Sequence, residues 1–531
     1  MLKTKQKAVV EGALLLTLTS FIVKILSAVY RVPFQNLVGD EGFYVYQQVY
    51  PIYGIAMTLG LSGLPILVSK MVAEQDTHTK QEEVIRGLFP LYWLLSLVLF
   101  VVFFLASGVL ARLMGDSELA PVIEMAAIVF LLVPYLTTYR GYFQGKLEME
   151  PTAYSQLFEQ LVRVGMILLV AWLYTSVNWT VYTMGRYAMS GAIFGGVVAL
   201  ITLLLFKPNL KLLVIPSKLE LYNSRKYLRR FLVEGGLICG YSSLLVIFQL
   251  VDSFLIKNAL VAQGLSDQQS KIIKGIYDRG QPLVQVGMVI GIALTTAFLP
   301  ILIRYVTEKN DWAYYRTIAL FVKTVIVISS AASVGLIMLL PYLNGSLFGD
   351  NQESLSLSVL MGTVFFMSLV LMLQIIYQTK NKFKIPVYSL LVGCLVKIGF
   401  GFLLTIQLGT VGASLATLCG LIGALILLLL GLEGQIKKCF INPDFIWKLL
   451  VALGMMIVSL LLYRWAMGVV IGNTTSRVIS FIQALLGVVI GGSVYVLVIF
   501  KTRMFTLREW LLLPKGNKLV RKVKKVSKNR I

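Results

Sequence analysis

The sequence predicts an all-helical, polytopic membrane protein. Of its 531 residues, 57% are hydrophobic and only 14% are charged, and the mean hydropathy is +0.81. A soluble domain of this length carries more charge, because its surface must face water. Apolar runs of the length that crosses a bilayer as a helix recur along the whole chain. We therefore expect about fourteen transmembrane helices.

The apolar runs form two sets of six and a final pair. They lie at about residues 12–37, 43–70, 87–111, 120–142, 155–175 and 182–206, then at 231–256, 280–304, 315–343, 354–378, 385–406 and 410–432, and finally at 446–471 and 477–500. No small-residue cleavage site follows the basic N-terminus, so we expect the first helix to be retained. Lysine and arginine gather in alternate loops, and since basic loops stay cytoplasmic, both termini are predicted to be inside.

A repeated pattern predicts two similar halves. The sequence LPILV at 64–68 returns as LPILI at 299–303, and LVRVG at 161–165 returns as LVKIG at 395–399, at nearly the same offset. An even number of helices per repeat makes the repeats parallel, as in transporters that hold substrate between two halves. The predicted parts are an N-lobe (1–206), a basic cytoplasmic linker (207–230), a C-lobe (231–432), two further helices (433–500) and a basic cytoplasmic tail (501–531).

Two basic residues inside the first apolar run mark a candidate site. Lys24 and Arg31 are seven residues apart, close to two helical turns, so they project from one side of the helix. A cation at bilayer depth costs about 3 kcal/mol or more. The pair therefore indicates either an anion site inside the helix bundle or a structural arrangement, in which Arg31 reaches the interface and Lys24 pairs with an internal carboxylate.

Charges at two further places also have a functional and a structural interpretation. Arg279 opens the eighth run, where it either binds an anion or pairs with the neighbouring Asp278. Glu159 and Arg163 are one helical turn apart in the fifth run, and we expect them to pair on one face.

Lys397, in the eleventh run, could neutralise Asp252 or Glu234, both of which we place in the seventh run. That arrangement would be structural. Alternatively, Lys397 competes with a coupling cation, which would make these residues functional, and the sequence does not choose between the two.

Four tyrosines cluster near the start of the second run. Tyr44, Tyr46, Tyr50 and Tyr53 lie within ten residues. They could stack against sugar rings or gate a pathway, or they could belong to the aromatic belt that forms at membrane interfaces.

The net charge of +23 is mostly topological bias, concentrated in the linker and the tail. A basic segment next to a membrane attracts anionic lipid headgroups by about 1 kcal/mol per residue. The tail therefore either binds anionic lipid or is a solvated, disordered segment that only fixes the topology, and nucleic acid is not an expected partner. The four cysteines are scattered, and the single histidine, His78, lies in a polar stretch. We expect no metal site and no cofactor, apart from a possible coupling ion, Na⁺ or H⁺.

Several motifs resemble a known family. The residues Tyr142–Gly145, Pro151–Ala153, Glu159–Gln160 and Arg163 resemble the signature between spans four and five of the stage V sporulation protein B group. That group is similar to the MurJ lipid II flippases of the multidrug/oligosaccharidyl-lipid/polysaccharide exporter superfamily. Tyr277–Arg279 resembles the Asp-Arg pair that opens span eight in the family.

Lys24 and Arg31 match the two basic positions of the family in span one, although arginine is usual at the first of them. The second run also lacks the internal arginine of these flippases and offers tyrosines instead, and Lys397 stands where some members are thought to hold sodium.

The resemblance implies two six-helix lobes that form a V around a cationic cavity, in a bacterial plasma membrane. It also implies export of undecaprenyl diphosphate-linked cell-wall precursors by alternating access, with Lys24, Arg31 and Arg279 on the diphosphate. The alternatives are a cation-coupled multidrug exporter of the same superfamily and a membrane scaffold for wall-synthesis enzymes. No motif of a membrane enzyme is present, so we do not expect catalysis.

Overall fold

The computed structural model describes residues 2–206, 218–440, 443–471 and 476–506, and over these ranges the chain is helical, without strands. Most of the predicted basic tail (507–531) and part of the predicted linker (207–217) lie outside the described residues. The first part of the chain contains α1 (Leu2–Val29), α2 (Arg31–Met57), η1 (Thr58–Gly63), α3 (Leu64–Ala73), α4 (His78–Leu105), α5 (Ser107–Leu113), η2 (Ser117–Leu119), α6 (Ala120–Ile128), η3 (Val129–Leu132), α7 (Val133–Gly145), α8 (Glu150–Ser176) and α9 (Val181–Phe206).

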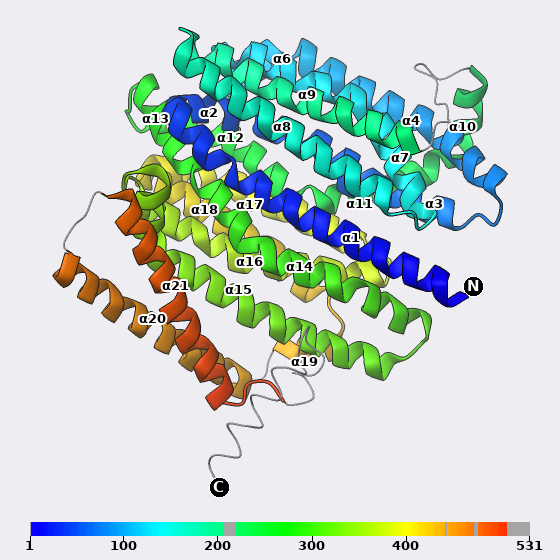
Figure 1. Ribbon diagram of the computed structural model, residues 1–531. Coiled ribbons are helices and arrows are strands. Elements are labelled where there is room, and N and C mark those ends of the chain that lie inside the picture. Colours follow the sequence, from blue (N-terminus) through cyan, green and yellow to red (C-terminus); the bar gives the residue numbers. More distant parts are fainter. Residues whose placement is uncertain (1, 207–217, 441–442, 472–475, 507–531) are drawn as a thin grey trace. The chain divides into compact units, whose positions relative to one another are not determined.

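The second part begins with a polar helix and continues with mostly apolar ones (Figure 1). It contains α10 (Lys218–Arg230), η4 (Phe231–Gly235), α11 (Gly236–Ser242), α12 (Leu244–Ala262), α13 (Asp267–Asp278), α14 (Gly280–Thr307), α15 (Asp311–Phe348), α16 (Ser354–Thr379), α17 (Lys384–Leu408), α18 (Thr410–Leu430), α19 (Gly434–Phe440), α20 (Pro443–Ile471) and α21 (Arg477–Lys501).

The prediction of a polytopic helical membrane protein is confirmed. Among the described residues, 13 helical segments are long and apolar enough to cross a membrane. The first of them, Leu15–Ala73, has 59 residues and would be roughly 90 Å long as one straight helix, which is enough for two crossings. Counting it twice accounts for the expected fourteen spans.

A turn at Gly39 divides this first segment. Gly39 has φ 71° and ψ −177°, a backbone conformation that residues with a side chain rarely adopt. Beyond Gly39 the chain reverses direction. Two contacts show this: the hydroxyl oxygens of Tyr30 and Tyr46 are only 3.1 Å apart, and the rings of Phe34 and Tyr46 are 4.9 Å apart. The turn brings the second span against the end of the first.

The described chain divides into two compact units. Unit 1 comprises Met1–Val289 and Asn381–Leu427, and unit 2 comprises Ile290–Lys380 and Leu428–Ile531. In unit 1, α8 packs against α9 and α1 (Figure 1), while α2 packs against α9, α12 and α13. In unit 2, α15 packs against α16, α20 and α21. The two repeat-based lobes, with their boundaries at 206 and 231, stay a prediction.

Small residues let α2 and η1 approach their neighbours closely. A Cβ atom at Gly54 would lie 2.9 Å from a methyl carbon of Val246, and one at Gly63 would lie 2.8 Å from the sulfur of Cys239. Such contacts replace side-chain packing with backbone packing, as is common between membrane helices. They fix α2 against α12 and η1 against α11, and so position the side chains described next.

Candidate functional site

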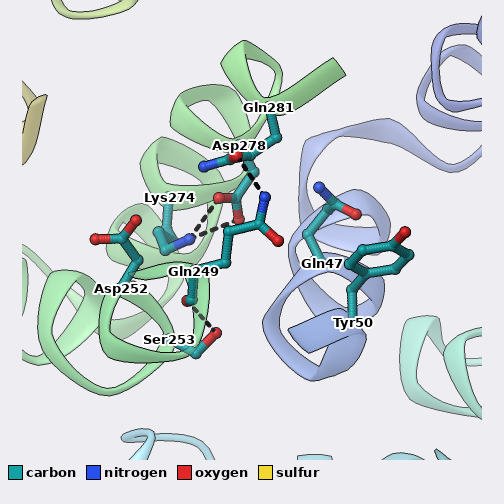
Figure 2. A pocket seen from close by; sticks show the side chains of 8 residues that line it. All are labelled: Gln47, Tyr50, Gln249, Asp252, Ser253, Lys274, Asp278 and Gln281. Carbon is teal, nitrogen blue, oxygen red and sulfur yellow. Dashed lines mark hydrogen bonds and ion pairs between the residues drawn. The ribbon is translucent and has the colours of Figure 1, made fainter. Parts of the chain in front are cut away.

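A polar pocket lies inside unit 1, between α2 on one side and α12, α13 and the start of α14 on the other (Figure 2). Its empty volume is about 230 Å³, less than that of a typical pocket for a drug-sized ligand. The residues that line it are Gln47, Tyr50, Gln249, Asp252, Ser253, Lys274, Asp278 and Gln281.

The charges in the pocket wall are paired. Lys274 donates to both carboxylate oxygens of Asp278, at 2.6 and 2.7 Å, one helical turn along α13. The amide nitrogen of Gln249 donates to Gln281 at 2.8 Å, which joins α12 to α14. The pocket therefore offers amide and hydroxyl groups rather than a surplus of charge.

A second buried ion pair joins the pocket wall to α17. The Nζ atom of Lys397, on α17, lies 2.8 Å from a carboxylate oxygen of Asp252 and donates to the carbonyl of Phe248 at 2.8 Å. This is one of the two pairings that the sequence allowed. The other does not form, because Glu234 lies in η4, before the apolar segment Leu244–Ala262, and not inside the seventh span as we had placed it.

Arg279 pairs with Asp40 rather than with the adjacent Asp278. Its Nε and Nη2 atoms donate to the two carboxylate oxygens of Asp40, at 2.9 and 2.7 Å. This bidentate geometry is the strong form of an arginine–carboxylate pair. Gly275 makes it possible, because a Cβ atom there would overlap the backbone oxygen of Asp40. The contact fastens α13 to the turn after Gly39.

Arg31 is fully buried and lies 4.3 Å from the centroid of the Tyr50 ring. Among the described residues, none of its three guanidinium nitrogens has a hydrogen-bond partner. The buried cation is therefore held by the face of an aromatic ring, an interaction worth about 0.5–2 kcal/mol. Lys24, earlier on α1, is instead exposed, so the structure does not bring the two residues of the predicted pair into one buried site.

Arg163 is also buried, and the prediction that it pairs with Glu159 is wrong. Glu159 accepts a 2.5 Å ion pair from Arg140 on α7. Arg163 donates from Nη2 to Gln160 at 2.6 Å and to Ser27 at 3.3 Å, whereas its Nε and Nη1 atoms have no partner among the described residues. Glu159 pairs with Arg140 instead of Arg163 because Arg140 reaches it from the neighbouring helix α7.

The tyrosines of α2 face the interior rather than a membrane interface. Tyr44, Tyr46 and Tyr53 are buried, and Tyr50 is partly buried. The rings of Tyr46 and Tyr50 are 6.0 Å apart, and those of Tyr50 and Tyr53 are 5.6 Å apart. The guanidinium carbon of Arg163 lies 5.0 Å from the centroid of Tyr53. The aromatic-belt interpretation is therefore wrong for these residues, which enclose two arginines.

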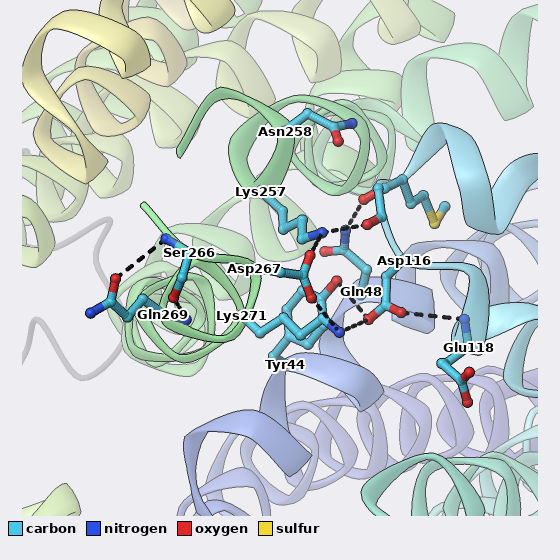
Figure 3. Close-up of polar contacts among 12 residues, drawn as sticks. Tyr44, Gln48, Asp116, Glu118, Lys257, Asn258, Ser266, Asp267, Gln269 and Lys271 are labelled. Carbon is cyan, nitrogen blue, oxygen red and sulfur yellow. Dashed lines mark hydrogen bonds and ion pairs between the residues drawn. The ribbon is translucent and has the colours of Figure 1, made fainter. Parts of the chain in front are cut away.

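A polar network joins α2, α9 and the residue before η2 to α12 and α13, and Figure 3 shows its part around Asp116, Lys257 and Asp267. Asp116 accepts hydrogen bonds from Tyr44 and Tyr182, at 3.3 and 2.9 Å, and its carboxylate lies 3.3 Å from Lys271. Lys257 contacts the carboxylate of Asp267 and the carbonyl of Gly115. In the predicted topology this network lies at the outer end of the spans.

A second charge cluster lies at the other end of unit 1. Arg230, at the end of α10, makes 2.5 and 2.6 Å hydrogen bonds to both oxygens of Glu74 and a 2.8 Å bond to Glu234. Glu234 also accepts a 2.8 Å bond from Lys70. The hydrogen bonds from Arg230 lower the pKa of Glu74. Burial alone would raise the pKa of Glu234, but the bonds from Lys70 and Arg230 lower it overall.

Sequence reasoning missed several of these side chains. Asp40, Asp116, Lys257 and Lys271 sit at the ends of apolar runs, where charged residues are ordinarily solvated. A signal was present for Arg140, which lies inside the fourth predicted run, where an arginine needs a partner.

Comparison with known proteins identifies the family of this chain. Residues 9–306 match the model of a family described as polysaccharide biosynthesis protein. The chain is 34% identical to the uncharacterized membrane protein YabM of Bacillus subtilis (strain 168), with 98% of this chain and 97% of the relative covered. It is 24% identical to the lipid II flippase MurJ of the same organism, with 91% and 94% covered.

A solved structure of the lipid II flippase MurJ, in an inward closed conformation, superposes with a TM-score of 0.67, covering 91% of this chain and 98% of that one. The two sequences are 14% identical, so this likeness establishes the fold.

Proposed function

Since the chain belongs to the polysaccharide biosynthesis protein family, we propose that it moves a lipid-linked saccharide precursor across the plasma membrane. Its membership of the multidrug/oligosaccharidyl-lipid/polysaccharide exporter superfamily, in the MurJ-like group, is confirmed. So is its nature as a multi-pass protein of a bacterial plasma membrane. The precursor we propose is an undecaprenyl diphosphate-linked unit of the cell wall, similar to lipid II.

The observation that carries this proposal is the unpartnered guanidinium of Arg31 beside a polar pocket. A lipid-linked sugar diphosphate bears about two negative charges on a headgroup that cannot cross hydrocarbon unaided. Its polyprenyl tail can stay in lipid throughout. A protein that moves it needs a polar path with an anion site and no catalytic group.

Alternating access fits the closed pocket. The headgroup enters only after α2 separates from α12 and α13, so loading requires the contacts between these helices to open. We propose that the pocket opens toward one side of the membrane at a time, with the Arg279–Asp40 contact and the Asp116 network closing one end and the Arg230–Glu74 cluster closing the other. Both sets of contacts are formed in this conformation.

Export of a cationic drug is less well supported by the pocket. Such a substrate needs a carboxylate that can pair with it, but Asp252 and Asp278 already pair with Lys397 and Lys274. Whether Na⁺ or H⁺ drives the return step stays a prediction, as does recruitment of wall-synthesis enzymes.

Reconstitution in liposomes tests the proposal. The translocation of a fluorescent lipid-linked disaccharide-peptide is measured for the wild type, for Arg31→Ala and for Arg186→Gln. Arg186 is an exposed arginine of α9, so its variant controls for loss of charge. We expect movement with wild type and control and none with Arg31→Ala. Movement of a different lipid-linked glycan would replace the substrate, and no movement of any lipid would overturn the function.

A further inference from the structure

We propose that Arg31 and Arg163, with Tyr50 beside them, form one anion site that takes both charges of a diphosphate. The inference rests on the proposed function for the identity of the ligand, which is the diphosphate of a lipid-linked saccharide. It assigns to Arg163 a role in binding that its position on α8 did not suggest, and it gives Arg279 a structural role instead.

The charge balance of the interior supports this site. Eight basic side chains are buried in the described chain. Six of them contact six carboxylates: Arg140 with Glu159, Lys257 with Asp267, Lys271 with Asp116, Lys274 with Asp278, Arg279 with Asp40, and Lys397 with Asp252. Arg31 and Arg163 are the remaining two. The unmatched charge inside the described part of the protein is thus that of a dianion.

The two unmatched arginines lie against the same group of tyrosines. Arg31 stacks on Tyr50 at 4.3 Å, and Arg163 approaches Tyr53 at 5.0 Å and Tyr30 at 5.7 Å. The rings of Tyr50 and Tyr53 are neighbours at 5.6 Å. Both cations therefore border one aromatic layer, which screens them from each other only weakly, and a shared anion would relieve their repulsion.

Most of the hydrogen-bond donors of the two arginines have no acceptor in the described part of the chain, apart from Nη2 of Arg163, which donates to Gln160 and Ser27. All three nitrogens of Arg31 and two of the three nitrogens of Arg163 have no partner among the described residues. Leaving a buried charged donor without an acceptor lowers the stability of the folded protein. A protein keeps such groups where a ligand completes them. Phosphate oxygens suit guanidinium groups because they accept two parallel hydrogen bonds from each.

Tyr50 connects the site to the pocket. It is the one α2 tyrosine that is only partly buried, and it lines the pocket while Arg31 lies against its ring. Figure 2 shows its side chain beside Gln47, on the α2 side of the pocket. Rotation of Tyr50 about its Cα–Cβ bond would open Arg31 to a headgroup in the pocket. A diphosphate then replaces the Tyr50 ring as the partner of Arg31 and accepts hydrogen bonds from Arg163.

Binding of inorganic pyrophosphate to the purified protein, followed by calorimetry in detergent, tests the site without transport. We expect Arg31→Gln and Arg163→Gln each to weaken binding about tenfold or more, as the loss of a charge-assisted hydrogen bond predicts. Arg163→Lys should recover part of the affinity, which shows that a folded protein is being measured. Arg186→Gln serves as the matched control and should bind like the wild type.

A second arm distinguishes the sources of the anion. Farnesyl diphosphate should compete with pyrophosphate at the same site, whereas phosphatidylglycerol, which carries a single charge, should not. Unchanged pyrophosphate affinity in Arg163→Gln overturns the inference, even if Arg31→Ala abolishes transport and the proposed function stands. Conversely, loss of pyrophosphate binding in both variants confirms the site even if no lipid-linked saccharide moves, in which case the proposed function fails alone.

Discussion

The buried cations of unit 1 occupy two regions that differ in how their charge is balanced. Around α12, α13 and α17, each buried lysine or arginine meets a carboxylate, usually from another helix. At the start of α2 and on α8, Arg31 and Arg163 meet tyrosine rings instead. The first arrangement fastens helices together. The second leaves positive charge in place at a cost in stability, which is characteristic of a binding site rather than of a scaffold.

The largest expected effect comes from breaking a pair in the balanced region. Lys397→Met leaves the Asp252 carboxylate buried without its cation, and such a loss typically costs about 3–5 kcal/mol. We expect a strongly lowered thermal unfolding temperature in detergent. The double variant Lys397→Met with Asp252→Asn should recover much of the loss, because no lone charge is left.

An unfolding temperature of Lys397→Met equal to that of the wild type would show that Asp252 is not desolvated. The Lys397–Asp252 pair would then no longer be an example of a buried charge that needs its partner for stability.

The next effect concerns the close approach of α13 to α2. Gly275→Val places a branched side chain where the backbone oxygen of Asp40 now lies, and overpacking of this kind costs about 1–3 kcal/mol. Since Arg279 would be pulled away from Asp40, we expect both a lower unfolding temperature and a weaker Arg279–Asp40 contact.

A double-mutant cycle measures that second consequence. In the wild-type background, Arg279→Gln and Asp40→Asn should be strongly non-additive, and in the Gly275→Val background they should be nearly additive. The matched control is Gly454→Val, at a glycine of α20 where an added Cβ atom would meet nothing within 4 Å.

How much of this could be read from the sequence depends on distance along the chain. The apolar runs and the family signature are local features, and most runs were predicted near their observed positions, but the seventh was placed at 231–256 where the apolar helix is Leu244–Ala262. Arg279 and Asp40 are 239 residues apart, and Asp40 follows a glycine in what looked like a solvated loop. Charge pairs of this kind form only when the bundle assembles.

The charge pattern also explains the error at Glu159. Spacing along one helix predicted Arg163 as the partner of Glu159. A buried carboxylate can pair with any cation that packing brings near it, and Arg140 on α7 lies 2.5 Å from Glu159. Arg163 is therefore left without a carboxylate partner among the described residues. The Lys397–Asp252 pair could be named in advance only as one of two options, because helix order within a repeat does not fix which faces meet.

The third prediction concerns the unbalanced region and has the opposite sign. Arg31→Gln and Arg163→Gln should leave the unfolding temperature unchanged or raise it, because each removes an uncompensated buried charge. Arg140→Gln, which removes a paired one, should lower it. Thermal unfolding of the three variants under the same conditions checks the contrast. Equal destabilisation by all three would mean that Arg31 and Arg163 are structural.

The smallest expected effect depends on pH and concerns the cluster that holds α10. The lowered pKa values of Glu74 and Glu234 mean that the folded arrangement favours both carboxylates in their charged form. Their stabilising contribution is therefore fully present above the ordinary value of 4.5 and is lost as the pH falls through the lowered values. These side chains are partly exposed, so we expect about 1 kcal/mol or less.

Spin labels at two exposed arginines, Arg86 on α4 and Arg229 on α10, report this contact as a distance distribution. We expect a single short distance at neutral pH that persists at pH 4.5 and broadens only as the pH falls through the lowered pKa values of Glu74 and Glu234, where the two carboxylates of the folded protein become protonated. Glu74→Gln should broaden it at every pH, since Arg230 then loses both of its carboxylate oxygens there. A distribution that stays narrow in acid would place the hold on α10 in the packing of Tyr227 against Gly87 instead, and the balanced charges at this end would then be incidental to closure.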